Sequence, residues 1–406
     1  MTDSLRSPGM RDWPPEEMNR FRRIEDVFRD VCSGWGYDEV RTPTIEHLHL
    51  FTAAGTLSPQ MLDRVYSFLD WDGWSGERVV VRPESTIPVA RLYVELLADR
   101  GLAKLFYVQN VLRFAEGDEQ RESWQCGAEF LGDGHPQGDI EAIVVANEVL
   151  SRLGLDAEIT LSDPGILRAI LVKAGCDLGE QIELYDRVLD GDISALDDVQ
   201  DRIPGLNQEL SELLTVEGQG IEYISNLRSV LQATIPELKR PLDELGTVAE
   251  VLTRIGTDYR ISPVLVRNFE YYTGPVFGIE IDGMRVGGGG RYDGLTSVVG
   301  GGEVPAVGLA LEMDVVSSFL SESPESNTRI TIRPAGAESV DMIASFELAA
   351  ALRAAGTDVH IATGEAKSPK DVVVIGGKFL LTKNGTQATL SAVDDVVRAI
   401  AGAGND

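Results

Sequence analysis

The chain has 406 residues, of which 43% are hydrophobic and 25% are charged, an ordinary balance for a globular protein of two or three domains. No apolar run approaches the roughly 20 residues that a membrane-spanning helix requires, and residues 1–15 lack the basic and apolar regions of a signal peptide. Cys32, Cys126 and Cys176 are widely spaced and form no metal-binding pattern. We therefore expect a cytoplasmic protein with reduced thiols and no bound metal.

The net charge of -29 arises because 65 Asp and Glu residues outnumber 36 Lys and Arg residues. Proteins that bind RNA along its backbone usually present a basic face, since neutralising phosphates supplies much of their affinity. The acidic balance therefore argues against RNA as a partner without excluding it. A solvated acidic surface explains the charge equally well, and an acidic organism-wide proteome would produce the same excess.

The first part of the chain, residues 1–163, alternates between helices and strands. Hydrophobic spacing predicts a helix over 16–34, a strand over 36–43, strands within 77–89 and 104–129, a helix over 139–153 and a strand over 157–161. We interpret this part as the first half of a mixed sheet. Asp139 and Glu141, at the start of the second helix, are expected to stabilise its dipole.

Residues 164–260 are predicted to be helical, because leucines recur there at helical spacing. They form a helical insertion between the two halves of the sheet. The second half, residues 261–320, is predicted to contain strands over 264–272, 276–282 and 284–288, followed by a helix over 306–320.

A polar, proline-containing run marks residues 321–328 as a linker. Residues 329–406 then form a small α/β domain, with predicted strands over 329–333, 358–362 and 371–375, a helix over 338–355, and a hairpin of 379–382 with 387–390. The predicted fold class is α+β: an antiparallel sheet core with a helical insertion, followed by this small domain.

Polar residues on the predicted strands of the first half could bind a charged ligand. Glu84 and Thr86 are two positions apart, so on an extended chain they would project to one side and could accept hydrogen bonds from an ammonium group. A surface pair at the end of a strand is the simpler explanation of these two residues by themselves. Gln125 and Glu129 also lie on one face of a strand. Arg113, on the strand before it, requires an anionic partner, which is either a ligand or a structural carboxylate.

A second polar group lies in residues 265–274, with the sequence LVRNFEYYTG. Arg267 suits a carboxylate, and the hydroxyls of Tyr271 and Tyr272 suit a polar ring. The glycine run 287–290 precedes Tyr292 and allows close approach of neighbouring strands. It is not a phosphate-binding loop, because no Gly-Lys-Ser/Thr follows it. Together these residues suit a small zwitterion.

Segments 36–43, 82–86, 106–129, 265–274 and 287–293 appear in the order found in histidyl-tRNA synthetases and their non-catalytic relatives. The chain resembles this family over most of residues 9–320, and the resemblance implies a class II aminoacyl-tRNA synthetase-like core. It also implies a role for each residue. The amino group of histidine would be held by Glu84, Thr86 and Gln125, the imidazole by Glu129 and Tyr272 between Tyr271 and Tyr292, and the carboxylate by Arg113 and Arg267.

Three departures from the synthetase pattern affect ATP and tRNA. The family has an arginine that binds the ATP γ-phosphate where this chain has Val315, and a glycine near the position of Glu312. The loop after Arg113 is short, and its residues Glu116, Asp118 and Glu119 have the wrong charge to cover phosphates. The C-terminal domain resembles a trimmed anticodon-binding domain, in which 362–370 run almost directly into the next strand.

A chain that keeps the amino-acid half of the synthetase site and lacks the nucleotide half resembles the regulatory subunits of ATP phosphoribosyltransferase. This resemblance implies a homodimer within a hetero-oligomer containing a short catalytic subunit. It also implies L-histidine as ligand, no catalytic residues and no cofactor, and it argues against tRNA as a partner. A divergent histidine-tRNA ligase is the alternative, with Arg285 or Arg291 in place of the missing arginine. A stand-alone histidine sensor, or a paralogue that modifies another substrate, is a third reading.

Overall fold

The computed structural model describes residues 5–53, 65–71, 76–117, 119–132, 135–189, 192, 194–203, 218, 220–263, 272–321, 330–362, 370–383 and 386–401. The chain forms two compact units, Met1–Ser321 and Glu322–Asp406. Within the described ranges, no helix is both long and apolar enough to cross a membrane.

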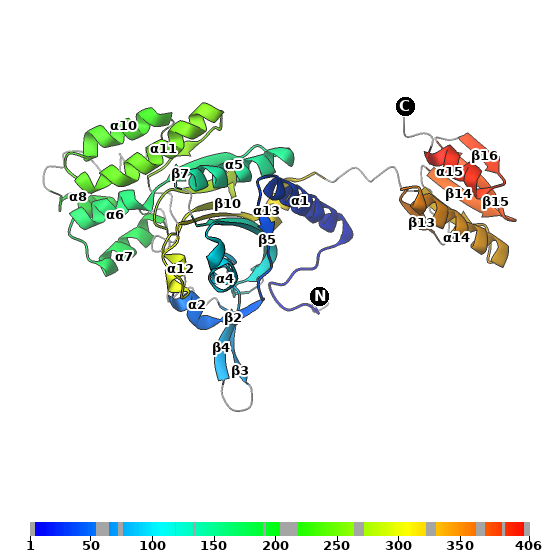
Figure 1. Cartoon of the computed structure of the whole chain (residues 1–406), viewed down its shortest axis with the longest axis horizontal. Coiled ribbons are helices and arrows are strands. Elements are labelled where there is room, and N and C mark those ends of the chain that lie inside the picture. The colour runs from blue at the N-terminus through cyan, green and yellow to red at the C-terminus, as the bar shows by residue number, and fades with distance from the viewer. Residues whose placement is uncertain are drawn as a thin grey trace. The chain divides into compact units, whose positions relative to one another are not determined.

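An eight-stranded sheet forms the centre of the first unit (Figure 1). Its strands, in spatial order, are β1 (Asp38–Glu39), β5 (Ala103–Leu112), β6 (Glu122–Leu131), β11 (Ala306–Glu312), β10 (Met284–Arg291), β9 (Val276–Ile281), β7 (Glu158–Ser162) and β8 (Arg260–Ile261). Neighbours run antiparallel except for the edge pairs β1–β5 and β7–β8, which are parallel. The sheet is therefore antiparallel through its centre, as the sequence predicts.

The glycine run of β10 allows this strand to lie close to both neighbours. A Cβ on Gly287 would come within 2.5 Å of the carbonyl oxygen of Ala310, and one on Gly288 within 2.5 Å of that of Phe277. Any side chain at these positions would push β9 or β11 away. The close strand approach expected from the sequence is confirmed.

Helices α1 (Pro15–Gly34) and α5 (Gln137–Arg152) pack on each other and on the sheet. In α1 the buried side chains Phe21, Ile24, Phe28 and Val31 recur at spacings of three and four, which places them along one face. They join Val145 and Val149 of α5 in the main hydrophobic core.

A smaller sheet contains β2 (Ile45–His47), β4 (Gly76–Val81) and β3 (Ser67–Trp71), in that spatial order. Figure 1 shows β3 and β4 extending away from the large sheet. Helix α2 (Leu48–Ala53) and helix α4 (Thr86–Leu92), the latter continued by η1 (Tyr93–Leu97) and η2 (Ala98–Arg100), share a second core with this sheet.

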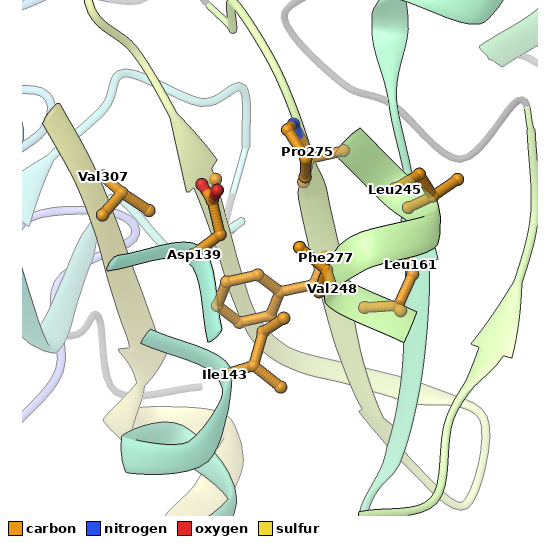
Figure 2. A pocket seen from close by; sticks show the side chains of 10 residues that line it. Asp139, Ile143, Leu161, Leu245, Val248, Pro275, Phe277 and Val307 are labelled. Atoms are coloured by element: carbon orange, nitrogen blue, oxygen red, sulfur yellow. The ribbon is translucent and has the colours of Figure 1, made fainter. Parts of the chain in front are cut away.

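The helices between β7 and β8 are α6 (Pro164–Lys173), α7 (Leu178–Leu189), α8 (Ala195–Gln200), α10 (Gly220–Leu231), η3 (Pro236–Leu238) and α11 (Lys239–Ile255). Asp163 begins α6 by accepting a hydrogen bond from the backbone N–H of Gly165 at 2.8 Å, and Pro164 occupies the first helical position. Figure 2 shows Leu245 and Val248 of α11 beside Leu161, Phe277 and Ile143. This apolar seam joins the helices to the sheet.

The second unit contains a five-stranded sheet with the spatial order β13 (Val359–Ile361), β12 (Ile330–Pro334), β14 (Lys370–Ile375), β15 (Lys378–Lys383) and β16 (Thr386–Leu390). Helices α14 (Ser339–Ala354) and α15 (Val393–Ala401) pack against it around Leu348, Leu352 and Val396. The expected α/β elements of this region are present, although the hairpin turn at 384–385 lies outside the described residues.

Two predicted elements were wrong. Residues 306–320 do not form one helix: 306–312 are strand β11, and helix α13 spans Met313–Phe319. A central strand covered on both faces is apolar throughout, so it lacks the alternation that identifies a strand. The extended segment within 77–89 ends at Val81, and helix α4 begins at Thr86. Glu84 and Thr86 therefore do not alternate along a strand.

Candidate functional site

Glu84 lies where the chain turns from β4 into α4. Its carboxylate accepts hydrogen bonds from the backbone N–H groups of Thr86 and Ile87, each at 2.9 Å, and so satisfies the first turn of the helix. Burial raises the pKa of Glu84 to about 7, although these two N–H groups and the nearby Arg113 oppose the shift. The side chain is thus fixed, and it becomes protonated near neutral pH.

Glu129 lies near the C-terminal end of β6, with 1% of its surface exposed. The hydroxyl of Tyr107 donates to Oε1 at 3.3 Å, and the hydroxyl of Tyr292 donates to Oε2. Hydrogen bonding by Thr86 also favours the charged form. Burial nevertheless raises the pKa of Glu129 to about 8, so the group carries a proton through much of the neutral range.

Gly308 provides the space for this carboxylate. It pairs with Glu129 across β6 and β11, and a Cβ at position 308 would collide with Oε2 of Glu129. The sequence analysis did not identify Gly308 or Tyr107 as part of the site. Their roles follow from strand register, for which one sequence gives no direct signal.

Gln125 and Glu312 also face each other across β6 and β11. Nε2 of Gln125 donates to Oε1 of Glu312 at 2.7 Å. Burial raises the pKa of Glu312, opposed by this hydrogen bond and by the charge of Arg113. The residue that replaces the family's glycine therefore contacts the amino-acid half of the site directly.

Arg113 follows β5 and is half-buried. Its Nε donates to the carbonyl oxygen of Pro83 at 2.7 Å, and its charge lowers the pKa values of both Glu84 and Glu312. The anionic partners that its burial requires include these two carboxylates. The charge of Arg113 thus acts on both acidic positions of the site.

Tyr272 and Tyr292 occupy different depths. Burial raises the pKa of Tyr272 to about 12; the nearby Arg285 opposes the shift, and Glu129 and Glu84 add to it. Tyr292 is only 2% exposed and donates to Glu129 from the protein interior. This hydrogen bond holds Tyr292 against Glu129, and its expected place beside the ligand ring stays a prediction. Arg267 and Tyr271 lie outside the described residues.

Arg291 forms buried ion pairs with two carboxylates. Its Nε lies 3.2 Å from Oδ1 of Asp139, and its two terminal nitrogens donate to Asp139 and to Glu244 of α11. The arginine side chain is 3% exposed and that of Asp139 is 2% exposed. The suggestion that Arg291 binds phosphate is therefore wrong. Asp139 was expected only to stabilise the dipole of its helix, but it also forms this buried ion pair.

The segment that resembles the nucleotide half of a synthetase site is acidic. Val315 packs against the hydrophobic core, and Oδ2 of Asp314 accepts the backbone N–H of Trp124 at 2.6 Å. The loop after Arg113 folds back at once, since the N–H of Arg113 donates to the carbonyl oxygen of Arg121 at 2.8 Å. Asp118 lies outside the described residues. Glu312 and Asp314, which belong to the described part of this segment, are acceptors and not the donors that a triphosphate needs.

Residues 9–316 match the histidyl-tRNA synthetase family. The chain belongs to this family. It is 45% identical over 311 residues to the ATP phosphoribosyltransferase regulatory subunit of Dehalococcoides mccartyi, an alignment that covers 76% of each chain. It is 31% identical over 335 residues to the histidine–tRNA ligase of Methanosarcina acetivorans, covering 80% of this chain and 78% of the ligase.

A solved structure from Bacillus halodurans, described as an ATP phosphoribosyltransferase regulatory subunit/histidyl-tRNA synthetase, superposes with a TM-score of 0.75. Its sequence is 26% identical, and the match covers 89% of this chain and 93% of that one. The predicted resemblance to synthetase-like regulatory subunits and the predicted class II core are confirmed.

Proposed function

We propose that this chain is a regulatory subunit of an ATP phosphoribosyltransferase in the first step of histidine biosynthesis. It activates a short catalytic subunit and senses free L-histidine, as a homodimer within a hetero-oligomer. The 45% identity to a regulatory subunit supports this proposal. It performs no catalysis itself.

One observation carries the proposal: polar groups that suit an amino acid lie beside the acidic residues Glu312 and Asp314, where the resemblance to synthetases places the nucleotide. Glu129, with its hydroxyl donors, lies on the same pair of strands as Glu312, and Asp314 follows directly. Carboxylates at the nucleotide position would repel the phosphates of ATP. The site therefore favours binding of the free amino acid over its activation.

In the proposed complex the amino group of histidine contacts Glu84, Thr86 and Gln125. The ring contacts Glu129 and Tyr272, with Tyr271 and Tyr292 around it, and the carboxylate contacts Arg113 and Arg267. Two buried carboxyl groups with raised pKa values favour a cationic ligand, because a positive charge stabilises their ionised forms. An imidazole also offers two ring nitrogens, which a carboxylate and a phenol can satisfy together.

The test is to reconstitute the chain with a short-form catalytic subunit and to measure phosphoribosyl transfer with and without histidine. We expect the chain to raise turnover and histidine to lower it again. The Glu129→Gln variant should still activate the partner but lose the response to histidine. Absence of any effect of the chain on the catalytic subunit would contradict the proposal.

The 31% identity to a histidine–tRNA ligase favours a second candidate function. Arg285 is the arginine left to contact phosphate, since it lies near Tyr272 and Glu312. ATP–pyrophosphate exchange in the presence of histidine separates the two functions. Robust exchange by the purified chain would establish the ligase and overturn the regulatory proposal.

A further inference from the structure

Glu312 occupies an unusual place for an acidic side chain. It is the last residue of β11 and stands at the N-cap position of α13. Its carboxylate reaches sideways to β6, where Oε1 accepts the hydrogen bond from Nε2 of Gln125 at 2.7 Å. The side chain therefore contacts a residue of the proposed amino-acid pocket.

This contact fixes the orientation of the Gln125 amide. An ionised carboxylate only accepts hydrogen bonds, so it selects the NH₂ end of the amide. Gln125 is 6% exposed, so its side chain has little freedom to turn over. Its carbonyl oxygen then points away from Glu312 as an acceptor, the group that an ammonium ligand needs.

The same carboxylate adds negative potential beside Glu84. Arg113 lowers the pKa values of both acids, which places its guanidinium near each of them. Arg285 also lowers the pKa of Glu312, so two arginines act on these two carboxylates. Glu312 offsets part of the positive charge of the arginines, and its own charge attracts an ammonium group and repels a phosphate attached to the ligand's carboxyl group.

We propose that Glu312 is a positioning residue that restricts this pocket to free α-amino acids with a protonated amino group, by orienting Gln125 and excluding acyl phosphates. The proposal rests on the proposed function, because it assigns the selectivity of the same histidine site. Glu312 acts through Gln125 and through its charge.

Equilibrium dialysis with two ligands tests the proposal: L-histidine, and 3-(imidazol-4-yl)propionate, which lacks the amino group. The variants are Glu312→Gln, which keeps the shape but can present either end of its amide, and Glu303→Gln, an exposed control on the segment before β11. We expect Glu312→Gln to weaken histidine binding by about tenfold, the effect of one charge-assisted hydrogen bond, and to leave the propionate unchanged. Glu303→Gln should change neither.

A second arm uses a non-hydrolysable histidyl-adenylate analogue with Glu312→Gly. We expect its affinity to rise relative to the unmodified chain while histidine affinity falls. A merely structural role would weaken all ligands together, and that result would overturn the proposal, as would an unchanged preference for histidine over the propionate in Glu312→Gln. If the unmodified chain binds no histidine at all, the proposed function itself has failed.

Discussion

The two halves of the proposed site lie on the same strands, but the groups around their carboxylates differ. Around Glu129, hydroxyl donors from Tyr107 and Tyr292 surround a carboxylate that sits in space left by Gly308. Around Glu312 and Asp314, acids and a core-packed Val315 stand where phosphates would bind. The strand geometry is common to both halves, so individual side-chain changes can alter one half without the other, which is what the proposed function requires.

The largest expected effect is on stability and concerns Arg291, whose buried ion pairs lie outside both halves of the site. Arg291→Met leaves Asp139 as an unpaired buried carboxylate, so we expect a loss of about 3–5 kcal/mol in the free energy of unfolding. Urea denaturation measures it, with the exposed Arg285→Met as control. A stable variant with altered nucleotide binding would restore Arg291 as a phosphate-binding candidate.

Removing the charge of Glu129 should weaken histidine binding to the amino-acid half of the site. Glutamine resembles the protonated acid, so the fold should persist, but it cannot become the anion that a cationic ring requires. We expect histidine binding to weaken by about 2–4 kcal/mol, measured by equilibrium dialysis. Glu116→Gln, on the exposed loop, is the matched control. Equal loss in both variants would place the ligand elsewhere.

Restoring the nucleotide half should increase the affinity for ATP, by less than the loss of histidine affinity expected for Glu129→Gln. The double variant Glu312→Gly with Val315→Arg removes one repulsive charge and adds one attractive charge near the start of α13. We expect roughly tenfold tighter ATP binding, since the interaction is partly screened by solvent. Competition with a fluorescent ATP analogue measures it. Val315→Arg by itself should gain less, and equal gains in both variants would mean that Glu312 does not repel phosphate.

The pH dependence of stability should show the smallest effect for a step of one pH unit. Glu129 has a folded pKa raised to about 8, whereas a carboxyl in an unfolded chain titrates near about 4.3. The folded state therefore holds a proton that the unfolded state releases. Its contribution is complete below about pH 4 and is lost as the pH rises to about 8, with Glu84 acting in the same sense up to about pH 7.

Urea denaturation between pH 5 and pH 8 measures this loss, which we expect to reach up to about 1 kcal/mol per pH unit. The slope should be smaller in Glu129→Gln, which cannot titrate at that position. A stability that rises across the same interval would show that Glu129 stays ionised in the folded protein.

The sequence correctly predicts which site residues share a regular strand. Gln125 and Glu129 lie on one strand as expected, because the two-residue period is a local property. Glu84 and Thr86 belong to the expected segment, but their arrangement differs, because the Glu84 carboxylate begins a helix by binding backbone N–H groups. Residues 306–312 were misread because a strand buried on both faces has no polar side to reveal it.

Contacts between strands could not be predicted in the same way. Tyr107, Gly308 and Glu312 contribute through register with β6, which depends on segments about 20 to 190 positions apart in the chain. Likewise, the pairing of Arg291 with Asp139 and Glu244 joins three distant elements. The ligand-binding roles of all nine predicted site residues remain predictions, and Arg267 and Tyr271 lie outside the described residues.

The burial of Glu129 among hydroxyl groups leaves this carboxyl group with a proton that it can pass to a ligand. An acid with a pKa of about 8 is mostly protonated at pH 7, whereas the imidazole of free histidine, with an ordinary pKa of about 6.5, is mostly neutral. The proton of Glu129 can therefore move to the ring when the ion pair forms, and the buffer gains none. The heat of histidine binding at pH 7 should then change little between phosphate and Tris, two buffers of different ionisation enthalpy, which calorimetry can measure.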